Sequence, residues 1–186
     1  ESALVDDGDP GEDRPAARSA RGATNGSVVL AILCLLAVQI GQRPLNDNSF
    51  LTHLATGRLI LEDGAIPRVD PYSFSAPGEP WTVQSWLASV IYAGSEQVGG
   101  LLLVRVLIMA LTLALVLLLW RATDPSRSTD GPVRLIGRTL PILAVVAIGS
   151  RYWSERPLLF GLVGLVLVIL AAEDEIHPAW LVPVMW

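Results

Sequence analysis

The residues best suited to chemistry in this sequence are an aspartate, Asp47, and a histidine, His53, which lie between two strongly apolar stretches. A carboxylate can take a proton from an attacking hydroxyl group, and a histidine can act as acid or base near neutral pH. Each residue also has a purely structural interpretation. Asp47 is well placed to cap a helix, a role compatible with catalysis, and His53 can be a hydrogen-bonded side chain on an interfacial helix.

Arginine supplies the second kind of chemistry, because all 13 basic residues are arginines. The planar guanidinium group suits the binding of phosphate. The candidates expected on the same side as Asp47 are Arg58, Arg105, Arg151 and Arg156. Arg105 interrupts an apolar run, where a charge is costly and often functional, although its side chain can also reach outward to the membrane surface. Arg151 and Arg156 can equally anchor a short loop.

Several other kinds of site are excluded or unsupported by the sequence. The single cysteine, Cys34, allows neither a disulfide within this chain nor a cysteine-based metal site. We find no glycine-rich phosphate loop, no serine nucleophile motif and no basic stripe for nucleic acid. We therefore assign no metal ligands, while a divalent metal at Asp47 stays open, and we expect no nucleic-acid partner.

The elements that must position these residues are apolar helices. Hydrophobic residues make up 52% of the 186-residue chain and charged residues 17%, and the apolar residues are bunched into runs. A run of about 20 residues spans a hydrocarbon core of about 30 Å as a helix. We expect an all-α fold, a polytopic transmembrane helix bundle, with helices at about 22–42, 98–120, 135–150 and 157–172 and a fifth starting at 179. The third and fourth are short for a full span.

The arginines near the ends of these runs predict the orientation. Residues 1–26 have no apolar periodicity and are predicted to form a disordered cytoplasmic tail, whereas 27–186 form the transmembrane domain. The tail and the loop 121–138 carry most of the arginines close to the membrane, so the positive-inside rule places both in the cytoplasm. We expect a multi-pass plasma-membrane protein with the loop 43–97 outside. Because the sequence stops within an apolar segment, we interpret it as an N-terminal fragment.

The outer loop, 43–97, is predicted to contain two helices. The first runs from Asp47 to Glu62, and Gly64 ends it. Turns follow, including Asp70-Pro71, where Asp70 is a turn residue or a functional one. Thr82 is expected to cap the second helix, which places four apolar residues on one face: Trp86, Leu87, Val90 and Ile91. Two amphipathic helices of this kind favour a position at the membrane interface.

The loop sequence NDNSFLTHLATGRLILEDGAIPRVDPYSFSAPGEPWTVQSWLASVIY resembles the first outer loop of bacterial membrane glycosyltransferases of the GT-C type. The likeness lies in an acidic residue after the first helix, a His-x-x-x-Gly helix, an I-P-x-x-D-P-[YF]-S motif and a P-W-x-x-x-x-W-L pair. Further on, RYWSERPLLFGL resembles the Arg-Pro opening of a later helix in these enzymes. The resemblance covers about residues 40–175.

This resemblance implies transfer of a sugar from a polyprenyl-phosphate donor to an acceptor at the outer face of the membrane. Asp47 matches the acidic residue that acts there, as a base or through a metal. His53 is the candidate for further acid–base work, and the candidate substrate-binding residues are Arg58, Asp70, Arg105 and Arg156. Many relatives carry a second acidic residue where this chain has Ser49, which argues against a metal held by two carboxylates.

The alternative is a polytopic membrane protein without enzymatic activity, either transporter- or flippase-like or a scaffold. Transporters have interrupted helices, as the short third and fourth segments suggest, but no internal repeat is visible. The expected partners are membrane lipids and a polyprenyl-phosphate-linked sugar. The sequence leaves open the sugar, the acceptor and the oligomeric state.

Overall fold

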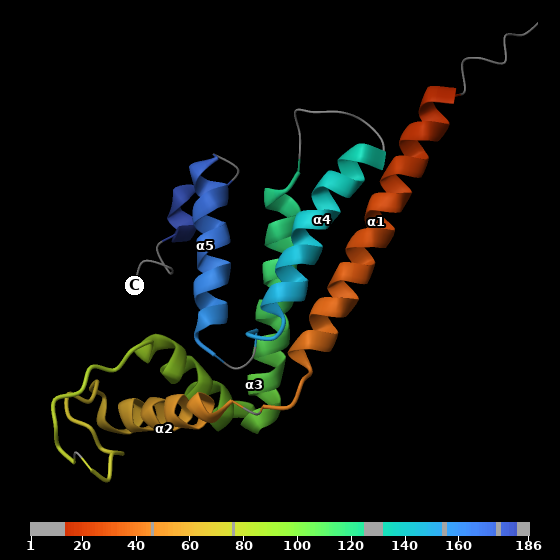
Figure 1. Ribbon diagram of the computed structural model, residues 1–186. Coiled ribbons are helices and arrows are strands. Elements are labelled where there is room, and N and C mark those ends of the chain that lie inside the picture. The colour runs from red at the N-terminus through yellow and green to blue at the C-terminus, as the bar shows by residue number, and fades with distance from the viewer. Residues whose placement is uncertain are drawn as a thin grey trace, which may run out of the picture.

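The computed structural model describes residues 14–45, 47–75, 77–124, 132–153, 156–173 and 176–181 (Figure 1). In these residues the structure is helical, with one isolated β-bridge between Val69 and Pro80. The helices are α1 (Arg14–Gly41), α2 (Asn48–Asp63), α3 (Trp86–Ala122), α4 (Pro132–Gly149), α5 (Leu158–Ala172) and the short 3-10 helix η1 (Pro178–Leu181). The expected all-α fold is confirmed.

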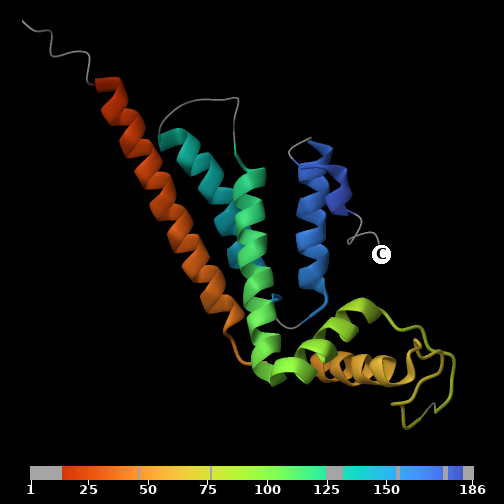
Figure 2. The ribbon, with the colours of Figure 1, turned by 180° about the vertical axis from the view of Figure 1, so that it is seen from behind.

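The helices form two parts that meet at a bend in α3. Figures 1 and 2 show α1, the long second part of α3, α4 and α5 running beside one another, while α2 and the first part of α3 lie across one end. We call residues 47–98 the cap, and α1, α3 from Leu101, α4 and α5 the bundle. Helix α3 belongs to both and contacts α1, α2, α4 and α5.

Two glycines produce the bend in α3. Gly99 and Gly100 have non-helical backbone angles, and Gly100 has φ 64° and ψ −166°. This region of the backbone map is accessible essentially only to glycine, because a Cβ atom would clash there. The predicted pair of helices, one in the loop and one in the apolar run that begins at residue 98, is therefore confirmed: the two helical segments of α3 meet directly at this break. The N-cap position of α3 is Ser85, not Thr82 as predicted.

Helix α2 forms where its local signals predicted. The Asp47 carboxylate accepts the backbone N–H of Ser49 at 2.8 Å, and Gly64 closes the helix in the left-handed conformation with φ 63°. Helices α4 and α5 also begin and end within a few residues of the prediction. The signals that were recognised are local ones, since they depend only on neighbouring residues.

Helix α1 begins earlier than expected. Residues 14–26 are helical, which corrects the predicted disorder there, while residues 1–13 of the predicted tail lie outside the described residues. This segment is rich in alanine, the strongest helix former, and Pro15 stands near the first turn, where its missing N–H is harmless. The fifth predicted helix, from 179, overlaps η1 and continues beyond the described residues.

Close packing joins the cap to the bundle. The ring of Tyr92 is fully buried and lies edge-on to Phe50 of α2 at 5.6 Å and to Phe160 of α5 at 5.7 Å between centroids. Within the cap, Gly57 lets α2 approach the first part of α3 so closely that a Cβ atom there would lie 1.9 Å from the backbone oxygen of Ser89. These contacts fix the height and direction of α2 at the end of the bundle.

One helix among the described residues, α3, is long and apolar enough to cross a membrane, while the apolar parts of α1 (Asn25–Gly41) and α5 are shorter. Large apolar side chains on all four bundle helices are nevertheless exposed: Leu35 (66%), Leu102 (71%), Ile148 (72%) and Leu165 (55%). Apolar exposure of this extent indicates association with a membrane or another protein.

Candidate functional site

The structure brings Asp47 together with Arg156, which is 109 residues away in the sequence. Asp47 lies at the junction of α1 and α2, and its side chain is only 9% exposed. One carboxylate oxygen accepts a hydrogen bond from Nε of Arg156, which precedes α5, and the other accepts the hydroxyl and the backbone N–H of Ser49. Two predicted site residues therefore form one ion pair between the cap and the bundle.

The partners of Asp47 decide its charge. Burial raises the pKa of its carboxyl group, but the hydrogen bonds from Ser49 and Arg156 and the positive charge of Arg156 together outweigh burial. The pKa of Asp47 is therefore lowered from its ordinary value of 3.8, and the carboxylate is ionised at neutral pH. While it is bound in this way, the group is a weak base, and it becomes a stronger one only when Arg156 moves away.

A cavity of about 320 Å³ opens beside this ion pair, and we call it the arginine cavity. Its lining includes Asp47, Arg43 and Arg151, and an apolar floor formed by the buried residues Ile40, Ile108 and Trp153. Arg43 donates a hydrogen bond of 2.7 Å from Nη1 to the backbone oxygen of Ser150, which holds it at the rim. A cationic rim above an apolar floor suits a ligand with an anionic head and an apolar chain.

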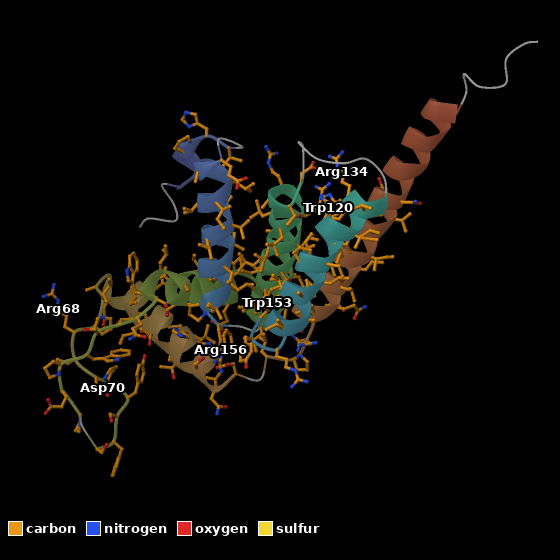
Figure 3. The ribbon with its side chains drawn as sticks, turned by 45° about the horizontal axis from the view of Figure 1, so that its top comes forward. Arg68, Asp70, Trp120, Arg134, Trp153 and Arg156 are labelled. Carbon is orange, nitrogen blue, oxygen red and sulfur yellow. The ribbon has the colours of Figure 1, made fainter. Side chains whose placement is uncertain are left out.

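Figure 3 shows how far this site lies from the other polar groups. Trp153 and Arg156 are at the junction of cap and bundle, Arg68 and Asp70 are at the far end of the cap, and Trp120 and Arg134 are at the opposite end of the bundle.

His53 lies on α2, about 9 Å further along the helix axis than Asp47 at 1.5 Å per residue. Its Nδ1 is 3.0 Å from the hydroxyl oxygen of Ser89. Burial lowers the pKa of His53 from 6.5, and the negative charge of Asp47 offsets part of this effect. The imidazole is therefore neutral at pH 7, and it bonds to Ser89 instead of pairing with Asp47.

Three other predicted residues lie apart from Asp47. Arg58 binds both carboxylate oxygens of Glu96 at 2.6 and 3.1 Å, and these hydrogen bonds raise the pKa of Arg58. Asp70 accepts the backbone N–H groups of residues 72 and 73, so it forms the predicted turn. Arg105 is exposed on α3, five residues beyond Gly100. Their predicted binding of substrate stays a prediction.

The contributors to the arginine cavity that were not among the predicted site residues include Arg43 and Trp153. A signal for Arg43 is present in the sequence. Arg43 and Arg151 each directly follow an apolar run, and because α1 and α4 run in the same direction (Figure 1) their C-terminal ends lie at the same end of the bundle. Nothing in the local sequence indicates that Trp153 would turn inward beneath Gly149, where it is 3% exposed.

The donor atoms at Asp47 do not fit a divalent cation. The site offers one carboxylate, which a guanidinium group already binds, whereas such cations take several oxygen ligands. Across the part of the chain that the structure describes, no group of three or more His, Cys, Asp or Glu side chains gathers. We therefore derive no step through a metal.

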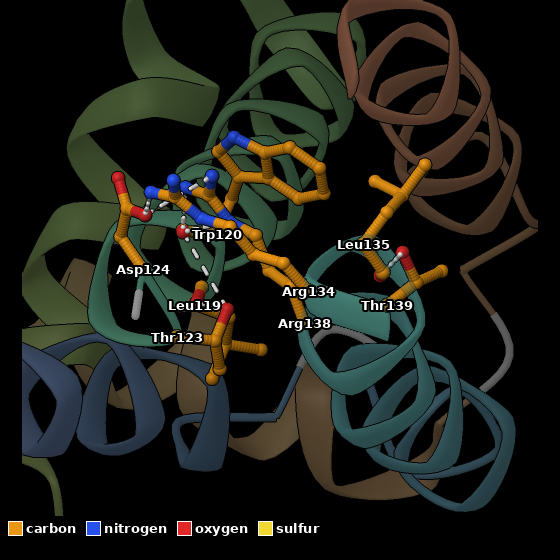
Figure 4. Close-up of polar contacts among 8 residues, drawn as sticks. All are labelled: Leu119, Trp120, Thr123, Asp124, Arg134, Leu135, Arg138 and Thr139. Carbon is orange, nitrogen blue, oxygen red and sulfur yellow. Dashed lines mark hydrogen bonds and ion pairs between the residues drawn. The ribbon is translucent and has the colours of Figure 1, made fainter. Parts of the chain in front are cut away.

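A second polar cluster, at the other end of the bundle, is structural (Figure 4). The guanidinium group of Arg138 lies over the Trp120 ring, 3.8 Å from its centroid, and donates a hydrogen bond of 3.0 Å to the Trp120 backbone oxygen. Arg134 donates to Asp124 at 2.8 Å. These contacts satisfy carbonyl and carboxylate groups at the end of α3 and fasten α4 to it.

No protein-family model, curated protein or solved structure matches this chain.

Proposed function

We propose that this chain belongs to a polytopic membrane glycosyltransferase that moves a sugar from a polyprenyl-phosphate donor to an acceptor at the outer face of the plasma membrane. The observation that carries the proposal is the convergence of Asp47, Arg43, Arg151 and Arg156 around a cavity with an apolar floor. A lipid phosphate has the matching chemistry, an anionic head on an apolar chain, and sugar transfer needs a carboxylate to accept the proton of the attacking hydroxyl.

The proposed membrane placement follows from the two parts of the fold. All four bundle helices expose apolar side chains, as lipid-facing helices do, and the cap helices lie across the end of the bundle, where the interface would be (Figure 2). The arginine cavity is then at the level of the lipid headgroups. The arginines at the opposite end, Arg121, Arg134 and Arg138, support a cytoplasmic position for that end.

The ion pair suggests how donor binding would prepare the site. A phosphate entering the rim competes with Asp47 for the guanidinium group of Arg156. Withdrawal of Arg156 removes its hydrogen bond and its positive charge, both of which lower the pKa of Asp47, while the hydrogen bonds from Ser49 remain. The carboxylate therefore becomes a better base when the donor is present. A site of this kind stays unreactive until it holds a donor.

The proposed reaction is a substitution at the anomeric carbon of the donor sugar. The acceptor oxygen forms a bond to that carbon, and the bond from the carbon to the phosphate oxygen breaks with its electron pair going to the phosphate. The acceptor proton passes to Asp47, and the arginines stabilise the charge that develops on the leaving phosphate.

The test is transfer of radiolabelled sugar from a polyprenyl-phosphate donor by the protein in lipid nanodiscs, with bacterial membrane extract as acceptor. We expect Asp47→Asn to lower transfer by a factor of about 100 or more, because general-base catalysis contributes about 10²–10⁴. Arg156→Gln should raise the KM for the donor, and Arg134→Gln, at the far end of the bundle, should leave transfer unchanged. Transfer by Asp47→Asn at the wild-type rate, or no transfer by the wild type, would contradict the proposal. The second outcome would favour a transporter or scaffold.

A further inference from the structure

We propose that a second cavity, formed by α2 and residues 81–84 of the cap, binds a neutral saccharide. We call it the neutral cavity. Its volume is about 410 Å³, within the usual range of about 300–1,000 Å³ for small-molecule sites. The binding of a saccharide is proposed independently of the proposed function. Its assignment as the acceptor of the reaction rests on the proposed function.

The lining of the neutral cavity selects the chemical class of ligand. The polar side chains on it are uncharged at neutral pH: Thr52, His53, Thr56, Thr82 and Gln84. A phosphate or a cation would lose its hydration here without meeting a countercharge, and a purely apolar ligand would leave the hydroxyl and amide groups unpaired. A saccharide presents hydroxyl groups to these side chains and a C–H face to the indole of Trp81.

Contacts behind the neutral cavity hold its aromatic wall in place. The ring of Trp81 lies edge-on to Tyr72 with centroids 5.7 Å apart, and the backbone N–H of Trp81 donates to the backbone oxygen of Arg68 at 2.8 Å. The hydroxyl of Thr56 donates to the Thr52 backbone oxygen, so the Tyr72 hydroxyl donates to Thr56 across 3.2 Å. Because these side chains are already ordered, a ligand loses less conformational freedom of the protein on binding.

The hydrogen bonds of His53 leave one ring nitrogen for a ligand. Ser89 has a single hydroxyl hydrogen, which it donates to the Ser85 backbone oxygen at 3.3 Å. With this donor assignment, the Nδ1–H group of His53 donates to the Ser89 oxygen, and Nε2 carries a lone pair. Since His53 lines the neutral cavity, a saccharide hydroxyl is a suitable donor to Nε2.

The position of the neutral cavity fits an acceptor site. His53 contributes to its wall and is close enough to Asp47 for that carboxylate to influence its pKa. A short oligosaccharide lying along α2 from the neutral cavity would therefore bring a hydroxyl group to the Asp47 carboxylate. In this arrangement the arginine cavity holds the donor, and the neutral cavity holds the acceptor.

Binding is measured by saturation-transfer NMR on the protein in nanodiscs with maltose, cellobiose and mannobiose, with glucuronate and inorganic phosphate as charged probes. We expect saturable binding of at least one neutral disaccharide, weakened about tenfold or more by Trp81→Ala and by Gln84→Ala. Gln84 is exposed, so its substitution leaves the fold intact. Trp86→Phe, at an exposed tryptophan outside the neutral cavity, is the matched control. Binding of none of the three disaccharides, equal binding by all variants, or preference for a charged probe would overturn the proposal.

Measurements of disaccharide binding and of sugar transfer on the same samples distinguish failure of this inference from failure of the proposed function. Disaccharide binding retained in Asp47→Asn, together with loss of transfer, supports both. Disaccharide binding by a wild-type protein that transfers no sugar overturns the proposed function and leaves the saccharide site standing. Weaker binding in Gln84→Ala with an unchanged KM for the acceptor in the transfer assay overturns the assignment of the neutral cavity to the acceptor.

Discussion

Substitution of Gly57 by alanine should separate α2 from α3 and disturb the site. The added Cβ atom would lie 1.9 Å from the Ser89 backbone oxygen, and ordinary contact begins at 3.4 Å, so the helices must move apart by about 3.4 − 1.9 = 1.5 Å. Overpacking of this kind costs about 1–3 kcal/mol. Loss of the 3.0 Å hydrogen bond between His53 and Ser89 adds about 0.5–1.5 kcal/mol.

The higher helix propensity of alanine offsets about 1 kcal/mol of this cost, which leaves a net loss of about 0.5–3.5 kcal/mol in the free energy of unfolding. The assay is reversible unfolding of the protein in mixed micelles, followed by tryptophan fluorescence. NMR titration of His53 gives a second measure, since separation of the helices exposes the imidazole and should return its pKa towards 6.5.

Gly94→Ala is the matched control, because Gly94 belongs to the same helix pair and a Cβ atom there meets nothing within 4 Å. We expect this variant to be as stable as the wild type or more stable by up to about 1 kcal/mol. If Gly57→Ala proved as stable as Gly94→Ala and kept the pKa of His53 unchanged, the close approach of α2 and α3 described above would be refuted.

Three further predictions concern stability. Gly100→Ala should cost about 1–3 kcal/mol in a denaturation assay because of the positive φ, whereas Gly137→Ala, with open space around it, should not. Folding lowers the pKa of His53, so the contribution of this group to the free energy of unfolding should be complete above pH 6.5 and should decline as the pH falls below it. The unfolding midpoints at about pH 5 and about pH 7.5 should therefore differ less in His53→Gln than in the wild type. Arg138→Met should weaken the attachment of α4 to α3 more than Arg134→Gln does, because of these two arginines only Arg138 stacks on the Trp120 indole. The measurement is amide hydrogen exchange in α4, which should be faster in Arg138→Met. Equal exchange in both variants would contradict this.

The parts of the fold that the sequence predicted are those with local causes. Helix α2 has its N-cap, Asp47, and its left-handed terminal glycine, Gly64, within the segment itself. The two segments of α3 were predicted as separate helices, and the predicted start of the second, residue 98, lies next to the break at Gly99 and Gly100. The direction of the bend was not predictable, because it depends on the packing of the two segments against other helices.

The individual residues of the candidate site could be predicted from the sequence, but the contacts between them could not. The types of Asp47 and Arg156 indicated their chemistry, and both were expected at the outer end of the helices. Their pairing across 109 residues has no signature in the local sequence, and neither has the bond between His53 and Ser89. Such partners are selected by the packing of α2 on α3 and of α5 on α3, which depends on the whole set of buried side chains.

The bend at Gly99 and Gly100 sets the direction in which the first part of α3 leaves the bundle, and with it the position of α2, which packs on that part. Each residue added to or removed from an α-helix rotates the preceding segment by about 100° and shifts it by about 1.5 Å. A single insertion between Gly100 and the first buried contact of the bundle, Val104, would swing α2 away from α5 and part Asp47 from Arg156. We therefore expect length changes in this stretch to disrupt the site more than changes at the turn around Gly78, where there is open space.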